Sequence, residues 1–450
     1  MNNQILGVLL RNDLASFIMK TFQSVDGSQQ YQHNWHIEVL ADKLKLCKEG
    51  KIKRLIVTLP PRSLKSVAVS VAFSAWLLGH KPNARIVNVS YSEELSNKHA
   101  RDCRAVIESP WYKKIFKTRL KQNKRSEDEF ETLQNGYRLA TSTGGTLTGR
   151  GGNFIIIDDP IKPQEALSEI TRNKVNQWYN NTLLSRLDNQ EEGVIIIVMQ
   201  RLHTDDLVSF VQEHEDWEIV SLPAIAEIDE EYILSNGNVI NRKAGQVLNE
   251  KLATAETLTK IKNSIGSYNF SSQYQQQPIP LEGGIIKWDW FKFYDGSVSR
   301  ANGSSIFQSW DVASTTGSNN DYSACVTAFV DKNLFYIMDV FRDKLEFVDL
   351  RRKIKELKDN FGAEHIIIEN QGVGIGLISQ LKEDGLYAIP YQPKGSKTER
   401  ALLQTPVFEA GRVLLPKNTS WLDVFKSEIT AFPQVKHDDQ VDALIRLLHN

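Results

Sequence analysis

The sequence has little cysteine, no long apolar run and almost no net charge. Its three cysteines, Cys47, Cys103 and Cys325, stand far apart, so they form neither a disulfide framework nor the close pairs of a structural zinc site. This usage is typical of a reducing compartment. No stretch reaches the ~20 consecutive apolar residues that a membrane-spanning helix needs. We therefore expect a soluble, intracellular protein without membrane contacts.

The charge balance excludes a broadly basic protein. Lys and Arg number 54 and Asp and Glu number 55, which gives a net charge of -1 and an isoelectric point near 6.8. Any contact with nucleic acid must therefore come from local basic patches. Residues 1–13 lack the basic start and the small-residue cleavage site of a signal peptide. With 450 residues, 41% of them hydrophobic, the chain is long enough for two or three domains that each bury a core.

Short apolar runs alternate with amphipathic segments in the first half of the chain. Segments 66–78 and 165–186 have helical spacing. The runs between them are rich in Ile and Val, as in strands buried on both faces, and comprise Leu55–Leu59, Ile86–Val89, Phe154–Ile157 and Val194–Val198. This alternation predicts an α/β domain over residues 1–222, with a mostly parallel sheet between two helical layers.

The pattern weakens over residues 223–294 and then returns. The weak stretch contains polar turns and a helical segment near 255–262, and we interpret it as a small linker subdomain. Beyond it, four further strands are predicted at Ile306–Asp311, Ala324–Val330, Phe335–Phe341 and His365–Glu369. Consecutive strands followed by helices predict a mixed sheet in a second α/β domain, residues 295–450.

The segment 54–66, RLIVTLPPRSLKS, joins a predicted strand to a loop that ends in Lys-Ser. In the phosphate-binding pattern Gly-x-x-x-x-Gly-Lys-Ser/Thr, the Lys contacts the β- and γ-phosphates and the hydroxyl binds Mg²⁺. Here Lys65 and Ser66 fill those positions, but Leu59 and Leu64 replace both glycines. A helix beginning at Ser66 directs its positive end at the phosphates. The alternative is a proline turn with a solvated lysine.

The loop and a second strand end supply further candidate nucleotide-binding residues. Within the loop, Arg62 adds a cation and Ser63 joins the nucleotide-binding set. Segment 154–160, FIIIDDP, is a buried-type strand that ends in two carboxylates. A lysine-hydroxyl loop and a strand-end aspartate together are typical of ATPases that bind a nucleoside triphosphate with Mg²⁺. Asp158 is placed to hold the Mg²⁺, and Asp159 stands where these ATPases usually have a glutamate that orients the attacking water.

Two other positions are candidates for contact with the terminal phosphate. The glycine-rich segment 142–153 contains Arg150, which we consider as an arginine finger for its own or a neighbouring nucleotide; the alternative is a flexible turn. The fourth strand of the first domain ends at Gln200-Arg201, where a group that senses the γ-phosphate is usual. Gln200 is therefore included in the nucleotide site.

The last third of the chain carries a second set of acids at the ends of apolar elements. These are Asp311, Glu369 and the helix-opening group Asp438, Asp439 and Asp442. Asp438 and Asp442 are four residues apart and share one helix face. Crowded carboxylates repel one another unless cations bind between them, and two hard divalent ions ~4 Å apart are the expected occupants. The order strand, strand, helix is typical of a ribonuclease H-like nuclease.

Several neighbouring residues are assigned with alternatives. Asp321 is a possible further acid, although a loop aspartate is more often a helix cap. We interpret His437 as a neighbour of the acids that is already hydrogen-bonded, not as a ligand. The basic loop with Lys394, Lys397 and Arg400 is either a solvated loop or a clamp for a phosphate backbone.

An ATPase domain followed by a metal-dependent nuclease domain resembles the large terminase subunit of tailed bacteriophages and prophages. The resemblance covers nearly the whole chain and is carried by Trp35-His36, PPRSLKS at 60–66, TGRG at 148–151 with IIIDDP at 155–160, Gln200-Arg201, HTDDL at 203–207, YQQQP at 274–278, Asp311, Glu369, Gly411-Arg412-Val413 and HDDQVDAL at 437–444. It implies a P-loop ATPase domain, a linker and a ribonuclease H-like nuclease domain.

The resemblance also implies activity, cofactors and partners. It implies that ATP hydrolysis drives double-stranded DNA into a procapsid and that a metal-dependent endonuclease cuts the concatemer. The implied cofactors are ATP and Mg²⁺, with Mn²⁺ able to substitute in the nuclease. The implied partners are DNA, a portal protein, a small terminase subunit and other copies of the chain in a ring on the portal. The implied location is the bacterial cytoplasm, and transiently the procapsid portal.

Residue roles follow from the same resemblance. Gln32, in the segment just before Trp35, is implied to contact adenine. The residues implied to carry out ATP hydrolysis are Lys65, Ser66, Asp158 and Asp159, with Arg62 and Arg150 as candidate charge stabilisers. Those implied to bind the nuclease metals are Asp311, Glu369 and Asp438, with Asp439 and Asp442 as further members. The alternatives are a recombination or repair nuclease with a regulatory ATPase, a transposase-like enzyme, and an inactive prophage remnant.

Overall fold

The computed structural model describes residues 3–26, 30–145, 147, 149–279, 284–295, 304–313, 322–417, 419–435 and 437–449. The candidate acid Asp321 lies outside them. The chain divides into two compact units: residues 1–262 with 267–280, and residues 263–266 with 281–450. The predicted boundaries of a separate linker subdomain, at residues 222 and 294, stay predictions.

The strands of the first unit follow the Ile- and Val-rich runs of the sequence. They are β1 (Arg54–Thr58), β2 (Arg85–Ser90), β3 (Leu120–Arg125), β4 (Glu129–Thr132), β5 (Tyr137–Ser142), β6 (Phe154–Asp158), β7 (Val194–Met199) and β8 (Glu218–Ser221), with the separate hairpin β9 (Glu230–Ile233) and β10 (Val239–Arg242). Among the described residues, β1 to β8 form one sheet in the order β3-β4-β5-β2-β6-β7-β1-β8. Its pairs from β5 to β8 are parallel, whereas β3, β4 and β5 pair antiparallel. The mostly parallel sheet is therefore confirmed.

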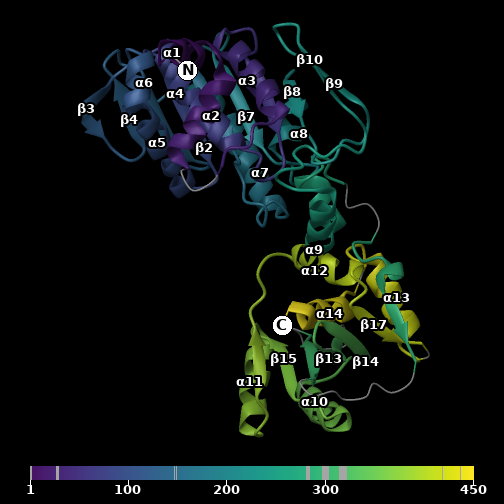
Figure 1. Ribbon diagram of the computed structural model, residues 1–450. Coiled ribbons are helices and arrows are strands. Elements are labelled where there is room, and N and C mark those ends of the chain that lie inside the picture. The colour runs from purple at the N-terminus through teal and green to yellow at the C-terminus, as the bar shows by residue number, and fades with distance from the viewer. Residues whose placement is uncertain are drawn as a thin grey trace. The chain divides into compact units, whose positions relative to one another are not determined.

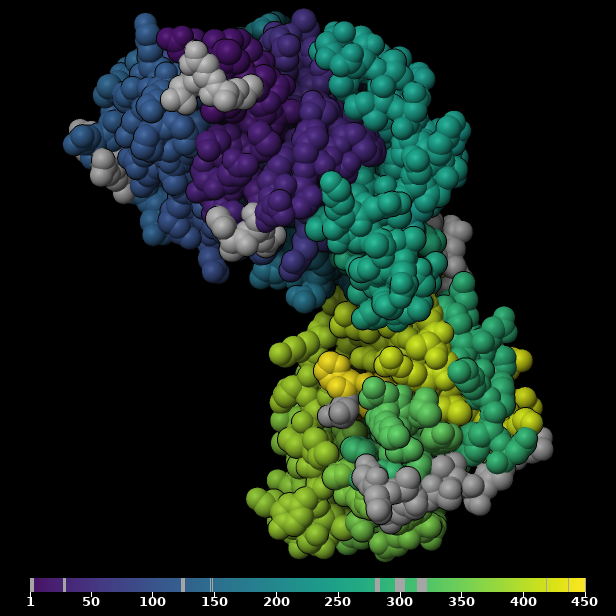
Figure 2. Space-filling view, viewed as in Figure 1, coloured from purple at the N-terminus to yellow at the C-terminus, as the bar shows by residue number. Residues whose placement is uncertain are grey.

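Helices cover both faces of this sheet (Figure 1). The helical segments are α1 (Asn3–Asn12), α2 (Leu14–Val25), α3 (Trp35–Lys48), the π-helical η1 (Val67–Phe73), α4 (Ser74–His80), α5 (Glu93–Glu108), α6 (Pro110–Ile115), α7 (Glu169–Trp178), η2 (Tyr179–Leu183), η3 (Leu184–Arg186) and α8 (Leu207–Gln212). A further helix, α9 (Ala255–Gln273), belongs to this unit except for residues 263–266. Strand side chains alternate between the faces, so Leu55 and Val57 pack with α2 to α6 while Ile56 packs with α7 and α8. In Figure 2, α1 to α3 (purple) form much of the visible surface of this unit. Within the described residues, no helix is both long and apolar enough to cross a bilayer.

The second unit contains a mixed sheet, as predicted. Its strands are β11 (Lys292–Tyr294), β12 (Ser305–Asp311), β13 (Ser323–Asp331), β14 (Leu334–Asp343), β15 (His365–Glu369), β16 (Ala388–Tyr391) and β17 (Val413–Pro416). In the described part of the unit they are ordered β11-β17-β14-β13-β12-β15-β16. The β12-β13-β14 meander is antiparallel, whereas β15 pairs parallel with β12 and β16. A meander followed by a parallel strand brings the end of β12 beside the end of β15.

Two groups of helices pack on this second sheet. They are α10 (Phe347–Phe361), α11 (Val373–Glu383), α12 (Lys397–Glu409), α13 (Leu422–Ala431) and α14 (Asp439–His449), with the short 3₁₀ turn η4 (Trp288–Trp290). Trp310 and Ile368 pack with α10 and α11. Because side chains alternate along a strand, the next residues, Asp311 and Glu369, face the side where α14 lies. Residues 439–448 of α14 are all buried, and little of that helix is visible on the face shown in Figure 2.

Candidate nucleotide and nuclease sites

The phosphate loop meets the end of β6 at the carboxyl edge of the first sheet. The Lys65 ammonium donates to Asp159 Oδ1 at 2.8 Å, and the Ser66 hydroxyl donates to Asp158 Oδ1 at 2.9 Å. The helical run that continues through η1 begins at Lys65, so its unpaired N–H groups face the loop. The structure thus brings together the four residues that the sequence proposed for phosphate and Mg²⁺. A hydroxyl and a carboxylate oxygen side by side fit the oxygen donors that Mg²⁺ prefers.

The Asp158 carboxylate lies in a buried polar pocket. It is 1% exposed, accepts a hydrogen bond from the Ser70 hydroxyl at 2.6 Å, and lies 3.6 Å from His99 Nδ1. Burial raises the pKa of Asp158, and the neighbouring charge of Asp159 raises it further. Burial lowers the pKa of His99 to about 3, with the charge of Arg138 acting in the same direction. His99 is therefore neutral near pH 7, and a bound cation is what would favour ionised Asp158.

The loop keeps a glycine-type backbone without glycine. Leu64, which stands at the second glycine position, has φ 62°, and Arg62 has φ 63°. Left-handed backbone at such residues stores ~1–3 kcal/mol of strain each. The Leu64 side chain packs against the hydrophobic core between the sheet and helices α2 to α6, which offsets part of that strain. Arg62 is exposed. Leu59, at the first glycine position, is fully buried and extends the core of β1.

Asp159 also adopts a left-handed backbone, with φ 46°. An aspartate tolerates this region better than most residues. Its Oδ1 accepts from Lys65 and, at 3.3 Å, from the backbone N–H of Gln200. The Gln200 side chain is buried and its Oε1 has no hydrogen-bond partner. Gln200 is thus bonded to Asp159 through its backbone, and its side-chain oxygen is an unused acceptor.

A histidine that sequence reasoning gave no role supports the loop from the other side. The buried His36 donates from Nε2 to the Ser63 carbonyl at 3.3 Å, and its Nδ1 accepts from the Asn34 amide at 2.9 Å. The second contact assigns the tautomer needed for the first. Burial lowers the pKa of His36 to about 4. These bonds place the segment that contains Gln32 next to the phosphate loop, and no signal in the sequence pairs His36 with Ser63.

Arg150 is not brought to this site. It immediately precedes the segment that leads into β6, and it pairs with Glu129 at 2.7 Å and lies over the Tyr137 ring. Tyr137 begins β5, whereas the phosphate loop lies where the parallel strands end. A five-residue strand spans ~17 Å, so Arg150 lies at the opposite edge of the sheet. Its role as an arginine finger stays a prediction, and only for the nucleotide of a second copy.

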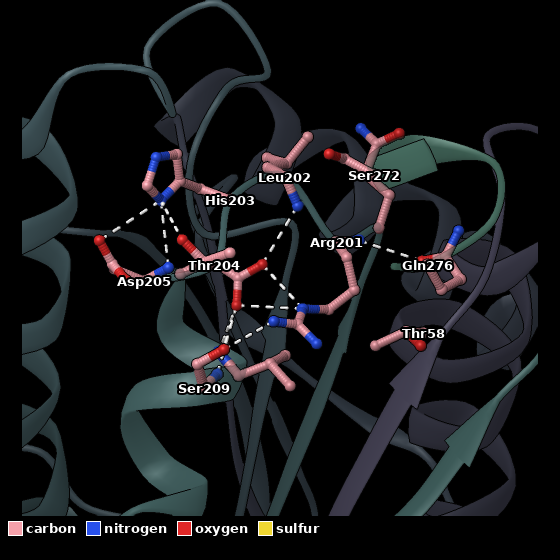
Figure 3. A network of polar contacts seen from close by, with 12 residues as sticks. Thr58, Arg201, Leu202, His203, Thr204, Asp205, Ser209, Ser272 and Gln276 are labelled. Atoms are coloured by element: carbon pink, nitrogen blue, oxygen red, sulfur yellow. Dashed lines mark hydrogen bonds and ion pairs between the residues drawn. The ribbon is translucent and has the colours of Figure 1, made fainter. Parts of the chain in front are cut away.

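Arg201, which follows Gln200, is bound into a separate polar network (Figure 3). Its guanidinium donates to both oxygens of Asp206, at 3.1 and 2.9 Å, and to the Ser209 hydroxyl at 2.6 Å. Asp206 also caps α8. The backbone N–H of Arg201 donates to Gln276 Oε1 at 3.0 Å. This bond connects the segment after α9 to the residues that follow β7. Arg201 therefore stabilises this end of the unit, and the role of Gln200 in the nucleotide site stays a prediction.

In the second unit, Asp311 and Glu369 lie at the ends of neighbouring parallel strands. Trp310 pairs with Ile368 in the register of β12 and β15, so the two acids follow at the same level. Burial raises the pKa of Asp311; the Arg446 guanidinium opposes this effect and the Asp442 charge adds to it. Both carboxylates have a counter-ion, because Arg446 forms an ion pair with each of them.

Asp438 and Asp442 lie at the start of α14, across from the basic loop. Lys397 Nζ lies 2.6 Å from an oxygen of each, and Arg400 donates to Asp442 at 3.0 Å. These carboxylates hold the Lys397 pKa above its usual value. Lys397 and Arg400 are thus not simply solvated, because they pair with the acids, while Lys394 is exposed. The phosphate clamp stays a prediction.

Asp439 has different partners from the other acids of α14. Its carboxylate lies 3.6 Å from Arg342, and burial raises its pKa to about 6, with the Glu428 charge adding to the effect. Gln440, the next residue, bonds to Glu428 through its backbone and side chain. Asp439 is thereby held toward the interior of the unit, and its role as a metal ligand stays a prediction.

A cavity of about 630 Å³ collects the predicted nuclease residues. Its lining includes Asp311, Glu369, His437, Asp438, Asp439, Asp442, Lys397 and Arg400. Carboxylate oxygens are the donors that hard divalent ions take, so the residue types fit such an ion. Yet no group of three or more His, Cys, Asp or Glu side chains in the described part of the chain is arranged as a metal site. In the structure, Arg446 lies between Asp311 and Glu369, and Lys397 lies between Asp438 and Asp442.

Comparisons with known proteins agree with this architecture. Residues 308–450 match the sequence model of the family described as Terminase RNaseH-like domain. The second unit therefore carries a terminase RNaseH-like domain. No curated protein sequence matches the chain.

Solved structures extend the likeness to the whole chain. Two crystal forms of the large terminase from a thermophilic bacteriophage match with TM-scores of 0.52 and 0.51, at 9% and 10% identity; they cover 96% and 91% of this chain and 98% of theirs. The same terminase in complex with ADP matches with a TM-score of 0.50, at 10% identity over 91% of this chain and 98% of that one. The chain has the fold of a phage large terminase, and the predicted resemblance and fold class are confirmed.

Proposed function

We propose that the chain is a viral DNA-packaging enzyme with two separate active sites. The first unit would bind and hydrolyse ATP to move double-stranded DNA into a procapsid, and the second would cut the concatemer with a divalent metal ion. The observation that carries this proposal is that each unit gathers its own set of phosphate-directed residues. Lys65, Ser66, Asp158 and Asp159 meet in one unit, and Asp311, Glu369, Asp438 and Asp442 line one cavity in the other.

In the nucleotide site, the chain's own residues divide the work. Lys65 neutralises charge on the β- and γ-phosphates when it leaves Asp159, and Ser66 with Asp158 would hold Mg²⁺, which shields the phosphate charge. Asp159, released from Lys65, becomes the acceptor that orients the attacking water. Gln200 presents its amide from the neighbouring strand end to the terminal phosphate. The ADP complex of the phage terminase supports a nucleotide in a protein of this fold.

In the nuclease site, the acids would hold a divalent ion and the bound DNA backbone beside it. Such an ion supplies a nucleophile from water and stabilises the leaving oxygen. The candidate ligands are Asp311, Glu369 and Asp438, with Asp439 and Asp442 as further members. Arg446 contacts both Asp311 and Glu369. Mn²⁺ shares the oxygen preference and would substitute for Mg²⁺.

The same likeness supports the proposed surroundings. A large terminase fold is consistent with a portal protein, a small terminase subunit and a ring of identical chains as partners. Ring assembly would also supply Arg150 to a neighbouring nucleotide, since it lies away from its own. We place this activity in the cytoplasm of a bacterial host and at the procapsid portal.

One experiment tests the two-site proposal. Asp311→Ala is expected to abolish Mg²⁺- or Mn²⁺-dependent plasmid cleavage while ATP hydrolysis persists, and Lys65→Ala to do the reverse. Asp349→Ala and Lys51→Ala are matched controls, because both side chains are more than half exposed. Loss of both activities in each single mutant, with unfolding temperature unchanged, would contradict two independent sites. Cleavage without any ATPase activity would favour the alternative of a transposase-like enzyme.

A further inference from the structure

Arg446 is a buried cation fixed between two of the nuclease carboxylates. Its side chain is 2% exposed, and its guanidinium donates to Asp311 Oδ1 at 2.9 Å and to Glu369 Oε2 at 2.6 Å. A further bond to the Trp310 carbonyl anchors it to the end of β12. Three acceptors on two strands match the rigid fork of a guanidinium. The guanidinium itself is buried, so separating Arg446 from these acceptors would leave a buried charge unpaired, which is strongly unfavourable.

Lys397 occupies the corresponding place between Asp438 and Asp442, but it is held differently. Its side chain is 47% exposed and comes from the first residue of α12, at the edge of the cavity. A lysine at the surface loses little when it returns to water, because its ammonium is fully solvated there. Another cation can therefore displace Lys397 from Asp438 and Asp442, whereas Arg446 stays bound to Asp311 and Glu369.

The charges of the cavity favour one divalent ion. Asp439, the fifth carboxylate of the lining, lies beside Arg342, and these two charges cancel. The other four carboxylates and the three cations Arg446, Lys397 and Arg400 leave one negative charge. If Lys397 swings out, two negative charges remain, which one divalent ion neutralises. A second ion would have to displace the buried Arg446 or leave the site with excess positive charge, and both are unfavourable.

We infer that Arg446 is the resident cation of the Asp311–Glu369 pair, so that the nuclease site binds one divalent ion, which takes the place of Lys397. This inference rests on the proposed nuclease function. It changes the expectation of two metal ions that the acids alone produce. Arg446 acts as a positioning residue: it supplies next to Asp311 the positive charge that a second ion would otherwise bring.

The test counts bound Mn²⁺ by electron paramagnetic resonance in the full chain without nucleotide. Asp158→Asn is included throughout, so that only the nuclease site contributes. We expect one Mn²⁺ per chain, and two in Arg446→Gln, where the Asp311–Glu369 pair is free. Arg400→Gln is the matched control: it removes the same charge from the same cavity, but not from that pair, and the count should stay at one.

Two outcomes would overturn the inference: two ions bound with Arg446 in place, or an unchanged count in Arg446→Gln that is folded by circular dichroism. If Arg446→Gln does not fold, Arg446→Lys and the count in the chain with Arg446 still decide, since both should give one ion. Failure of the proposed function has a different signature. In that case Asp438→Asn would leave the Mn²⁺ count unchanged and plasmid would not be cut in any variant.

Discussion

Leu64 shows at the scale of one residue how a phosphate loop can exist without glycine. Its left-handed backbone is unfavourable for a leucine, but its side chain gains apolar contacts with the first core. The strain of the backbone and the packing of the side chain act in opposite directions on stability. A search for the usual glycine pattern would therefore miss this loop. The backbone shape that presents N–H groups to phosphate is what the site requires, and packing can impose it.

A substitution pair at Leu64 tests this account. Leu64→Ile is expected to weaken ADP binding and to destabilise the first unit by ~1–3 kcal/mol, because a β-branched residue is a strong outlier at positive φ. Leu64→Gly relieves the strain but loses the packing, so it should keep ADP affinity within a few-fold. Calorimetric titration with ADP and thermal unfolding measure both effects. Equal behaviour of the two variants would show that backbone strain does not matter.

His36 makes a pH-dependent contribution to the same loop. Its folded pKa, about 4, lies below the ordinary value of 6.5, so the unfolded chain binds the proton more readily. The stability contribution is therefore complete above pH ~6.5 and is lost as pH falls toward 4. We expect acidification from pH 7 to 5 to lower the unfolding temperature less in His36→Gln than in the unmodified chain. An identical pH response in both would contradict the buried neutral histidine.

At the scale of elements, the YQQQP segment, residues 274–278, forms hydrogen bonds to the segments that follow β7 and β8. Gln275 bonds to both backbone groups of Ile225, and Gln276 accepts from the N–H of Arg201 at the end of β7. The sequence marked this segment through resemblance and through its Pro punctuation. It did not show that glutamine side chains replace backbone pairing there.

Removal of the second contact should have a measurable effect. Gln276→Ala leaves the Arg201 N–H without its acceptor and is expected to destabilise the first unit by ~1–3 kcal/mol. Gln277→Ala is the control, since the neighbouring glutamine is exposed. Chemical denaturation of both variants provides the comparison. A difference of less than ~0.5 kcal/mol between them would mean that this bond is dispensable.

Element boundaries divide into those that local pattern determines and those that it does not. The Ile-rich runs predicted β1, β2, β6 and β7 closely, because buried parallel strands need continuous apolar sequence. The pattern missed β3, β4, β5 and β8 of this sheet. β3 and β8 are its edge strands, where a continuous apolar sequence is not required. β4 and β5 are largely buried but contain charged residues such as Glu131 and Arg138, which interrupt the apolar pattern.

For the whole molecule, the arrangement of two units explains why separate activities are expected. Each has its own sheet, its own core clusters and its own set of acids at strand ends. In both sheets the site lies where parallel strands end, as the general rule for α/β sheets requires. This rule allowed Lys65 and Asp158 to be placed together from sequence alone.

The sequence by itself determined the strands, the phosphate loop and the identity of the acids, because local apolar pattern and residue chemistry do not depend on distant partners. Only the tertiary structure decided which cations lie among those acids. Arg446 is 135 residues from Asp311 and 77 from Glu369, and no local signal links them. Strand order sets β12 beside β15, and the packing of α14 then directs one buried guanidinium at both carboxylates. The same applies to Arg150, whose position at the opposite sheet edge depends on where β6 begins.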